Sequence, residues 1–416
     1  MPIIAPLPNT ITNGTLANAD EVQGNFDWIV DQVNANATGA GNPNHGGGSI
    51  ASNTAYGTNA LAGNTTGIDN SAFGNGALAT DTVGTENVAV GVNALGAAIN
   101  ATFCTALGSQ AISSATTPSG TVAVGYSALN SLSGTSTGIV AVGFEAMSAC
   151  SGSVSSSVAV GYRAGKNTAN IVRGTAVGYE ACTSLNNDCT GIGYRALFGT
   201  NTCTANTAVG SGAMATGNLV NTQCVAVGVN ALTAVSSGNA NTAVGYNAGN
   251  AGTPVTTGTQ LTLVGGNAQC NSASLSNATA LGYNAIATAS NTITLGNSSI
   301  ATLFCQVTSI TGISDERRKK DVARLGLGLD FIMKLAPVSY RYNNGDDTLR
   351  YGFIAQEVEK ALPGPADGLA LVAQAQDEER TYHLTYAEFI APLVKAVQEQ
   401  QRIIESLTSR LAAAGL

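Results

Sequence analysis

The chain has 416 residues, enough for two or three domains, and its composition is unusual for a compact globular protein. Hydrophobic residues make up 44% of the chain, aromatic residues 5% and charged residues 10%, and 50 residues are glycine. A globular protein normally carries about 25% charged residues, so we expect stacked repeats rather than a compact enzyme. The net charge of −8 argues against nucleic-acid binding, which needs clustered Lys and Arg.

The sequence gives no sign of a membrane span, a secretion signal or a metal site. No run of about 18 apolar residues occurs, and the first residues, MPIIAPLPNTITNGT, lack the basic and apolar segments of a signal peptide. The cysteines form no CxxC pair and only two histidines occur, so we expect neither zinc nor a cofactor. Buried thiols are favoured over disulfides. The eight cysteines are Cys104, Cys150, Cys182, Cys189, Cys203, Cys224, Cys270 and Cys305.

Charge divides the chain into parts. Residues 1–313 contain 4 Lys or Arg and 10 Asp or Glu, whereas residues 314–416 contain 13 and 15. We therefore predict three regions: an N-terminal helix and linker at 1–48 for attachment or trimerisation, a repetitive fibre at 49–313, and an ordinary globular domain at 314–416.

The N-terminal region contains one helical pattern. Within residues 19–37, Val22, Phe26, Ile29 and Val33 recur at spacings of 4, 3 and 4, which predicts an amphipathic helix. Its apolar stripe suits self-association or docking, and a small self-contained cap is the alternative. The Gly-rich stretch at 39–49 then reads as a flexible linker.

The middle region repeats a short unit, seen as NTAYGTNAL, NVAVGVNAL and NTAVGYNAG. A unit this short predicts one coil of a parallel β-roll. In Val88-Ala89-Val90 the side chains alternate, so we expect a strand buried on both faces, with little space on the alanine side. The following glycine suits a turn or a close backbone approach. The repeat glycines, mostly 17 or 18 residues apart, are Gly57, Gly74, Gly91, Gly108, Gly125, Gly143, Gly161, Gly178, Gly193, Gly210, Gly228, Gly245, Gly265, Gly282 and Gly296.

These units, with the closing NTITLGNSSI at Asn291 to Ile300, resemble the head repeats of trimeric autotransporter adhesins of the YadA type. The resemblance implies a left-handed parallel β-roll in which three chains pack side by side. The longer period and the missing anchor depart from that family.

The C-terminal region has the pattern of a small α+β domain that ends in a long helix. The sequence from Thr385 onward predicts a long helix. Its apolar residues follow a heptad, interrupted at Gln400, that suits a short, three-stranded coiled coil. The heptad positions are Phe389, Leu393, Ala396, Ile403, Leu407 and either Arg410 or Leu411. The earlier predicted elements are a helix at 325–335, strands at 338–342 and 350–353 joined by a turn, and a helix at 355–362 ended by Pro363.

Four segments of this region, SDERRKKDV, KLAPVSYRY, RYGFIAQEVE and LTYAEFIAPLVKAVQEQ, resemble the C-terminal intramolecular chaperone of phage tail fibres and tailspikes, the endosialidase type. The resemblance implies a domain that trimerises, guides folding of the upstream fibre and then cuts itself off between Ile313 and Ser314. Ser314 is then the nucleophile and Lys319 its base. Asp315, Arg317 and Gln356 match further positions and are possible supporting residues.

Spacing alone would not reveal this pair. A serine hydroxyl needs a base, and a lysine serves only when it is neutral, through burial or neighbouring cations. Five residues along a helix correspond to about 500°, so helical Ser314 and Lys319 would not share a face. From spacing alone, a helix-capping serine followed by a solvated charge run is the alternative.

Together these features predict a homotrimeric, phage-like tail fibre or spike for host attachment that assembles in the host cytoplasm and resides on the virion. The N-terminal phrase NGTLANADEVQGNF, similar to the start of tail-fibre proteins, predicts contact with a tail or baseplate protein. A host surface glycan or protein is the expected receptor. The alternatives are a structural virion decoration or a cellular trimeric adhesin with an uncleaved chaperone domain. A glycan-cleaving site is disfavoured because the few carboxylates of the repeats are not paired at an obvious spacing.

Overall fold

The computed structural model describes residues 23, 25–27, 50–132, 136–167, 169–184, 187–199, 204–215, 220, 222–300, 302–304, 306, 312, 314–343, 347–364, 369–374 and 380–415. The chain divides into two compact units, Met1–Leu295 and Gly296–Leu416. The predicted N-terminal stripe and linker lie outside the described residues except for Phe26, which is exposed in a helical turn at 25–27.

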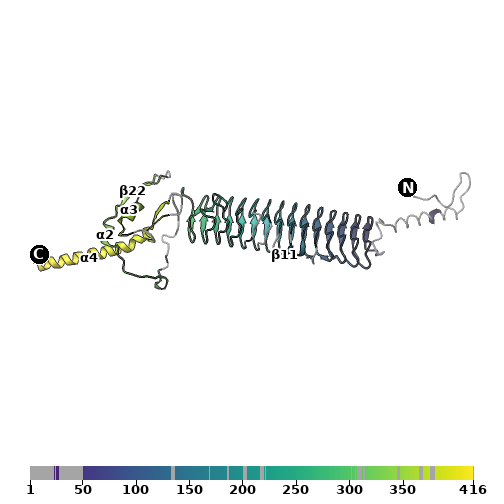
Figure 1. Ribbon diagram of the computed structural model, residues 1–416, viewed down its shortest axis with the longest axis horizontal. Helices are drawn as coiled ribbons and strands as arrows, with labels where there is room; N and C mark the ends of the chain where they lie inside the picture. The colour runs from purple at the N-terminus through teal and green to yellow at the C-terminus, as the bar shows by residue number, and fades with distance from the viewer. Residues whose placement is uncertain are drawn as a thin grey trace. The chain divides into compact units, whose positions relative to one another are not determined.

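The first unit contains a parallel β-solenoid whose main sheet has 15 strands (Figure 1). Paired residues are mostly 17 or 18 positions apart, as in Ala72 with Ala89 and Ala123 with Ala141. The predicted mainly β solenoid of 17–18-residue repeats is therefore confirmed. The strands of this sheet are β1 (Thr54–Tyr56), β2 (Ser71–Phe73), β3 (Val88–Val90), β4 (Thr105–Leu107), β6 (Val122–Val124), β8 (Val140–Val142), β10 (Val158–Val160), β12 (Thr175–Val177), β13 (Thr190–Ile192), β14 (Thr207–Val209), β15 (Val225–Val227), β16 (Thr242–Val244), β17 (Thr262–Val264), β19 (Thr279–Leu281) and β21 (Ile293–Leu295).

Two smaller parallel sheets line other sides of the coils. One has four strands in the order β11-β9-β7-β5, and the other pairs β18 with β20. Their bounds are β5 (Pro118–Ser119), β7 (Ser136–Thr137), β9 (Ser151–Ser155), β11 (Ala169–Val172), β18 (Gln269–Cys270) and β20 (Ile286–Ala287).

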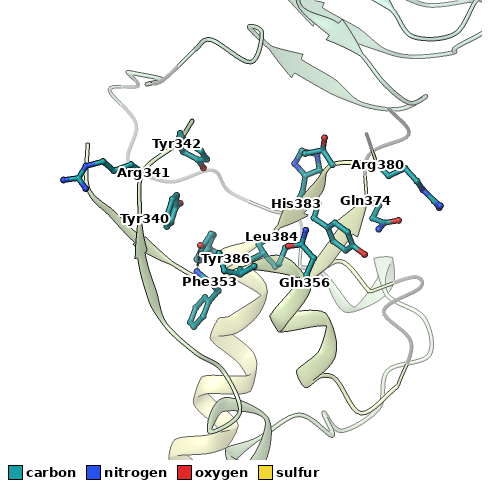
Figure 2. A pocket seen from close by; sticks show the side chains of 14 residues that line it. Tyr340, Arg341, Tyr342, Phe353, Gln356, Gln374, Arg380, His383, Leu384 and Tyr386 are labelled. Atoms are coloured by element: carbon teal, nitrogen blue, oxygen red, sulfur yellow. Dashed lines mark hydrogen bonds between the residues drawn. The ribbon is translucent and has the colours of Figure 1, made fainter. Parts of the chain in front are cut away.

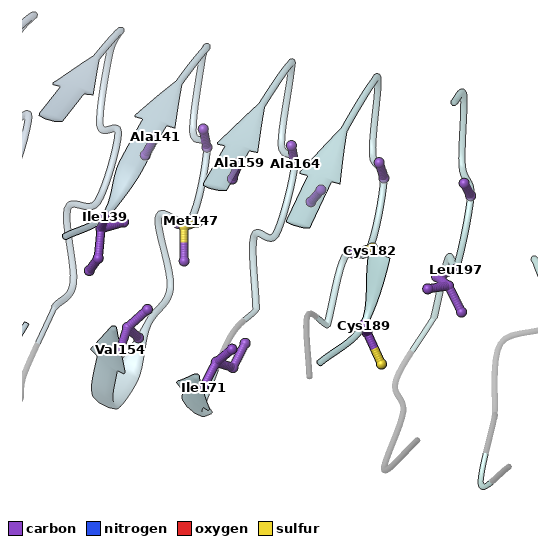
Figure 3. Close-up of a cluster of buried hydrophobic side chains, with 14 of the residues drawn as sticks. Ile139, Ala141, Met147, Val154, Ala159, Ala164, Ile171, Cys182, Cys189 and Leu197 are labelled. Atoms are coloured by element: carbon purple, nitrogen blue, oxygen red, sulfur yellow. The ribbon is translucent and has the colours of Figure 1, made fainter. Parts of the chain in front are cut away.

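The solenoid interior is filled by small and medium side chains. Ala89 in the middle of β3 is fully buried, while Val88 and Val90 are 37% and 40% exposed. The turn after most of these strands adds two more buried residues, such as Ala94 and Leu95. Figure 3 shows the same inward columns in the central coils. The expectation that both strand faces are buried is therefore wrong for the single chain, because the solenoid core covers only the alanine side.

The repeat glycines allow the coils to stack closely. From Gly57 to Gly282 their φ angles lie between 117° and 138°, a region that L side chains rarely adopt. A Cβ on Gly125 would lie 2.7 Å from the carbonyl carbon of Gly143 in the next coil. The predicted close backbone approach is confirmed.

A column of buried polar side chains precedes the first strands. The Nδ2 of Asn70 donates to the Gly84 carbonyl at 2.8 Å, and its Oδ1 accepts from the backbone N–H of Asn87 at 3.1 Å. Cys104 takes the next position of this column, and its backbone N–H donates to Asn87 Oδ1 at 3.0 Å. Six cysteines lie in the described part of the chain and all are buried thiols, as predicted; Cys203 and Cys305 lie outside it.

The second unit is small and mixed. Its elements enclose a second core formed by Phe331, Val358, Leu362, Leu371, Val372 and Phe389. Strands β22 and β23 pair antiparallel, as do β24 and β25. The elements are η2 (Glu316–Arg318), α2 (Leu329–Ile332), β22 (Val338–Tyr340), β23 (Arg350–Gly352), α3 (Ala355–Ala361), β24 (Val372–Gln374), β25 (Tyr382–Leu384), η3 (Tyr386–Phe389) and α4 (Ile390–Ala413).

The long C-terminal helix is present, but its predicted heptad needs correction. Phe389 and Ala396 are each only 5% exposed, because they pack inside their own unit. The half-exposed seam of α4 instead runs at alternating spacings of 4 and 3 and contains Leu393, Val397, Gln400, Ile404, Leu407 and Leu411. This helix is anchored by Glu399, whose carboxylate accepts from the backbone N–H of Leu329 at 2.7 Å, at the start of α2.

Candidate functional site

A short turn organises the segment after Gly312. Asp315 is extended and its Oδ1 accepts a hydrogen bond from the backbone N–H of Arg317 at 2.9 Å, which caps η2. The Arg317 guanidinium also pairs with this carboxylate, with Nη2 2.6 Å from Oδ2. These hydrogen bonds hold the pKa of the Asp315 carboxyl below its ordinary value. Two of the three residues expected to support the site, Asp315 and Arg317, therefore fix the turn itself.

The turn brings the predicted dyad together. The 3-10 helix η2 ends at Arg318, and Lys319 continues in extended conformation with φ −108° and ψ 145°. Its Nζ donates to Ser314 Oγ at 2.8 Å. The helical spacing argument does not apply here, because only three residues of the segment are helical. The same separation would let a neutral amine accept the hydroxyl proton.

The surroundings of the dyad are open. Ser314 and Lys319 are both exposed, as are the neighbouring Arg318 and Lys320. Ile313, on the other side of the predicted scissile bond, lies outside the described residues. Gln356 is exposed in the first turn of α3, and the described part of the chain shows no hydrogen bond between it and the dyad.

Gln356 instead borders a pocket of about 800 Å³ between the two hairpins of the unit. Figure 2 shows the aromatic side chains of Tyr340, Tyr342 and Tyr386 grouped on one side of this pocket. Tyr386 Oη accepts a hydrogen bond from the backbone N–H of Phe353 at 3.1 Å. A hydrogen bond to Tyr342 raises the pKa of Tyr340 to about 12.

The position of the dyad coincides with the start of a family match. Residues 314–365 match the Peptidase_S74 family model, chaperone of endosialidase. No curated protein matches the chain. The match begins at Ser314 and includes Lys319 and Gln356. With the β-solenoid before it, this chaperone domain fits a tailspike-like protein, and the family implies a self-cleaving peptidase.

Sequence reasoning missed the hairpin of β24 and β25, which supplies several residues that line the pocket. Its strands are three residues each, too short for an alternating pattern to stand out. The one available signal was the aromatic and β-branched run Thr381 to Thr385. In the described part of the chain, no group of three or more His, Cys, Asp or Glu could hold a metal ion, and no helix is long and apolar enough to cross a membrane.

Proposed function

We propose that the chain forms a homotrimeric tail fibre of a phage-like virion that attaches to a host surface, and that its chaperone domain cuts the Ile313–Ser314 bond by a Ser–Lys mechanism. The observation that carries the proposal is the 2.8 Å contact between Lys319 Nζ and Ser314 Oγ at the first matched residue of the chaperone family.

The outward face of the main sheet supports association. The last residue of each strand points away from the core and is a large apolar residue in all 15 strands, from Tyr56 through Val227 to Leu295. Many of these residues are 36% or more exposed in the single chain. A continuous apolar column of this length is typical of an interface, and copies of the same chain carry the matching repeat.

The helix α4 also supports association. Its exposed seam alternates in steps of 4 and 3 over almost the whole helix, which is the pattern of a coiled coil. Leu393, Val397, Ile404, Leu407 and Leu411 are each about half-exposed in the single chain. Two further copies of α4 would cover them.

The cleavage step balances as an acyl shift followed by hydrolysis. Lys319 accepts the hydroxyl proton of Ser314 while Oγ attacks the Ile313 carbonyl carbon. The amide bond breaks, the proton passes to the amine of Ser314, and an ester joins Ile313 to Oγ. Water then hydrolyses the ester and leaves a fragment that begins at Ser314.

This chemistry needs an environment that the single chain lacks. A lysine acts as a base only when it is neutral, which in proteins usually requires burial. Because Ser314 and Lys319 are exposed in one chain, we infer that neighbouring copies cover the dyad and that cleavage follows assembly.

The test compares the full chain with Ser314→Ala, Lys319→Ala and Lys320→Ala on denaturing gels, with mass spectrometry of the small fragment. The wild type and Lys320→Ala should release a fragment that begins at Ser314, and the other two variants should stay intact. Lys320→Ala is the matched control, since it removes the next lysine along the chain, whereas the hydrogen bond to Ser314 comes from Lys319. Release of the fragment by Lys319→Ala at the wild-type rate would exclude the dyad.

A further inference from the structure

One segment of the solenoid differs from the other coils in its charge. Residues 1–313 contain four Lys or Arg, and all four lie between Arg163 and Arg195. Residues 126–198 hold these four cations and three Asp or Glu, whereas the rest of 1–313 holds seven Asp or Glu and no cation. The four-stranded second sheet, from β5 to β11, lies in an overlapping part of the solenoid, since its strands fall between Pro118 and Val172.

Five aromatic side chains stack in this segment, one from each successive coil. They occupy the position directly after the repeat glycine, and we call them the aromatic ladder: Tyr126, Phe144, Tyr162, Tyr179 and Tyr194. Neighbouring ring centroids are 4.9–5.4 Å apart and the planes differ by 8–18°. Four of these aromatic residues, three tyrosines and Phe144, are 42–52% exposed, so the aromatic ladder is accessible to solvent in the single chain.

A row of alternating charge runs beside the aromatic ladder. In the last four of these five coils the residue after the aromatic one is charged, which gives the charge ladder of Glu145, Arg163, Glu180 and Arg195. Arg163 Nε donates to Glu145 at 2.8 Å, and Arg195 Nε donates to Glu180 at 3.0 Å. Lys166 also donates to Glu145 at 2.7 Å. The guanidinium groups lie over ring faces, with Arg163 5.0 Å from the Tyr162 centroid.

The charge ladder occupies positions that the fold otherwise gives to other residues. These four residues have φ near +50°, where Asn and Gly are more readily accommodated than Glu or Arg. The equivalent position in other coils is often Asn or Gly, as in Gly76, Asn93, Gly212, Asn230 and Asn247. Local backbone preference therefore does not explain the four charges, and such departures are expected at functional positions.

We infer that the aromatic and charge ladders together bind an acidic polysaccharide laid along the fibre axis. This deepens the proposed attachment function and rests on it, because it names the surface and the chemistry of the receptor. The ring spacing is close to the length of one sugar unit in an extended polysaccharide, so successive sugars can meet successive rungs. Phenol hydroxyls can bond sugar hydroxyls, and ring edges can cover the apolar faces of the sugars.

The guanidinium groups supply the acid recognition. In the described part of the chain, Arg163 and Arg195 use only Nε in hydrogen bonds, which leaves their terminal nitrogens for a carboxylate or phosphate. The glutamates hold each guanidinium in place, so little side-chain freedom is lost on binding. Outside this segment the fibre is acidic, so an anionic chain is attracted here and repelled elsewhere.

The experiment measures binding of the full-length protein to immobilised polygalacturonate, with neutral dextran as the uncharged control. The matched variants are Arg163→Asn/Arg195→Asn and Glu145→Asn/Glu180→Asn, since Asn is the residue that several other coils use at this position. The wild type should bind polygalacturonate and not dextran. The arginine variant should bind about tenfold more weakly or worse. The glutamate variant should lose clearly less, because it gives up the positioning of the guanidinium groups but also removes two carboxylates that repel an anionic chain.

Three results would overturn the proposal that the two ladders bind an acidic polysaccharide. They are no wild-type binding to polygalacturonate, wild-type affinity in the arginine variant, and equal losses in both variants with altered unfolding, which would indicate a role in the fold alone. Adherence to a panel of bacterial cells reports on attachment separately. Adherence that survives in the arginine variant would leave the attachment function standing and place the receptor site elsewhere.

Discussion

Substitution of a repeat glycine should be far more damaging than substitution of another glycine in the same coil. Gly125 has φ +130°, and a Cβ there would lie 2.7 Å from the carbonyl carbon of Gly143 and closer still to its oxygen. The dihedral strain costs about 1–3 kcal/mol. Non-bonded carbon atoms normally approach to about 3.5 Å, so the two coils must also separate. The separation weakens the backbone hydrogen bonds between the coils, which are worth about 1 kcal/mol each. We expect Gly125→Ala to cost about 3–5 kcal/mol.

Gly120 is the matched control. It also has positive φ, +55°, but a Cβ there would meet only the backbone nitrogen of Gly138, at 3.8 Å. Gly120→Ala should therefore cost only about 1 kcal/mol. Both variants are compared by thermal unfolding followed by circular dichroism, in the uncleaved Ser314→Ala chain so that all samples have one covalent form. Equal shifts in the unfolding midpoint would refute the close-approach explanation of the repeat glycines.

Three other predictions follow from particular contacts. Asp81 is buried and its Oδ2 has no hydrogen-bond partner in the described residues, and burial raises the pKa of its carboxyl. The folded state therefore binds the proton more tightly than the unfolded state, so the contribution of Asp81 to stability falls as pH rises above about 4. Asp81→Asn should unfold at a higher temperature than the wild type at pH 7 and should lose that advantage in acid. In the proposed coiled coil, Gln400→Leu should raise the thermal stability of the trimer, and Leu407→Asp should lower the mass measured by light scattering. No effect of either substitution would show that α4 does not pair with other copies. Val227→Lys places a charge on the outward column and should weaken association without changing the solenoid spectrum, whereas unchanged mass would place the interface elsewhere.

The repeat architecture was predictable because nearly every coil repeats the same short sequence pattern. The sequence V-A-V-G alternates at a strand period and then supplies the one residue that tolerates the close approach between coils. The partial exposure of Val88 and Val90 was not predictable from that pattern. Alternation shows that two faces differ, and only the path of the coil shows that one face has no core beneath it.

The C-terminal unit was predicted less accurately, because tertiary contacts override local patterns there. The helix expected at 325–335 is reduced to α2, since Lys395 of α4 donates to the carbonyls of Leu325 and Gly326 and holds them out of a helix. Phe389 fits a heptad in the sequence but packs in the local core. Ser314 and Lys319 came from the family resemblance, because their spacing brings them together only when the helical turn stops at Arg318.

The repetition that makes the solenoid easy to predict from the sequence also makes the register of three chains in the proposed trimer hard to establish. Nearly every strand ends in a large apolar outward residue, so three chains displaced by one whole coil would still pair apolar columns. Only irregular features distinguish the registers, such as the step of 15 residues from Gly178 to Gly193 and the ladders around Tyr162. A non-repetitive domain at one end can associate in a single way and sets the register before the coils dock. Its removal afterwards would leave a fibre that cannot easily find that register again, so cleavage would convert correct alignment into kinetic stability.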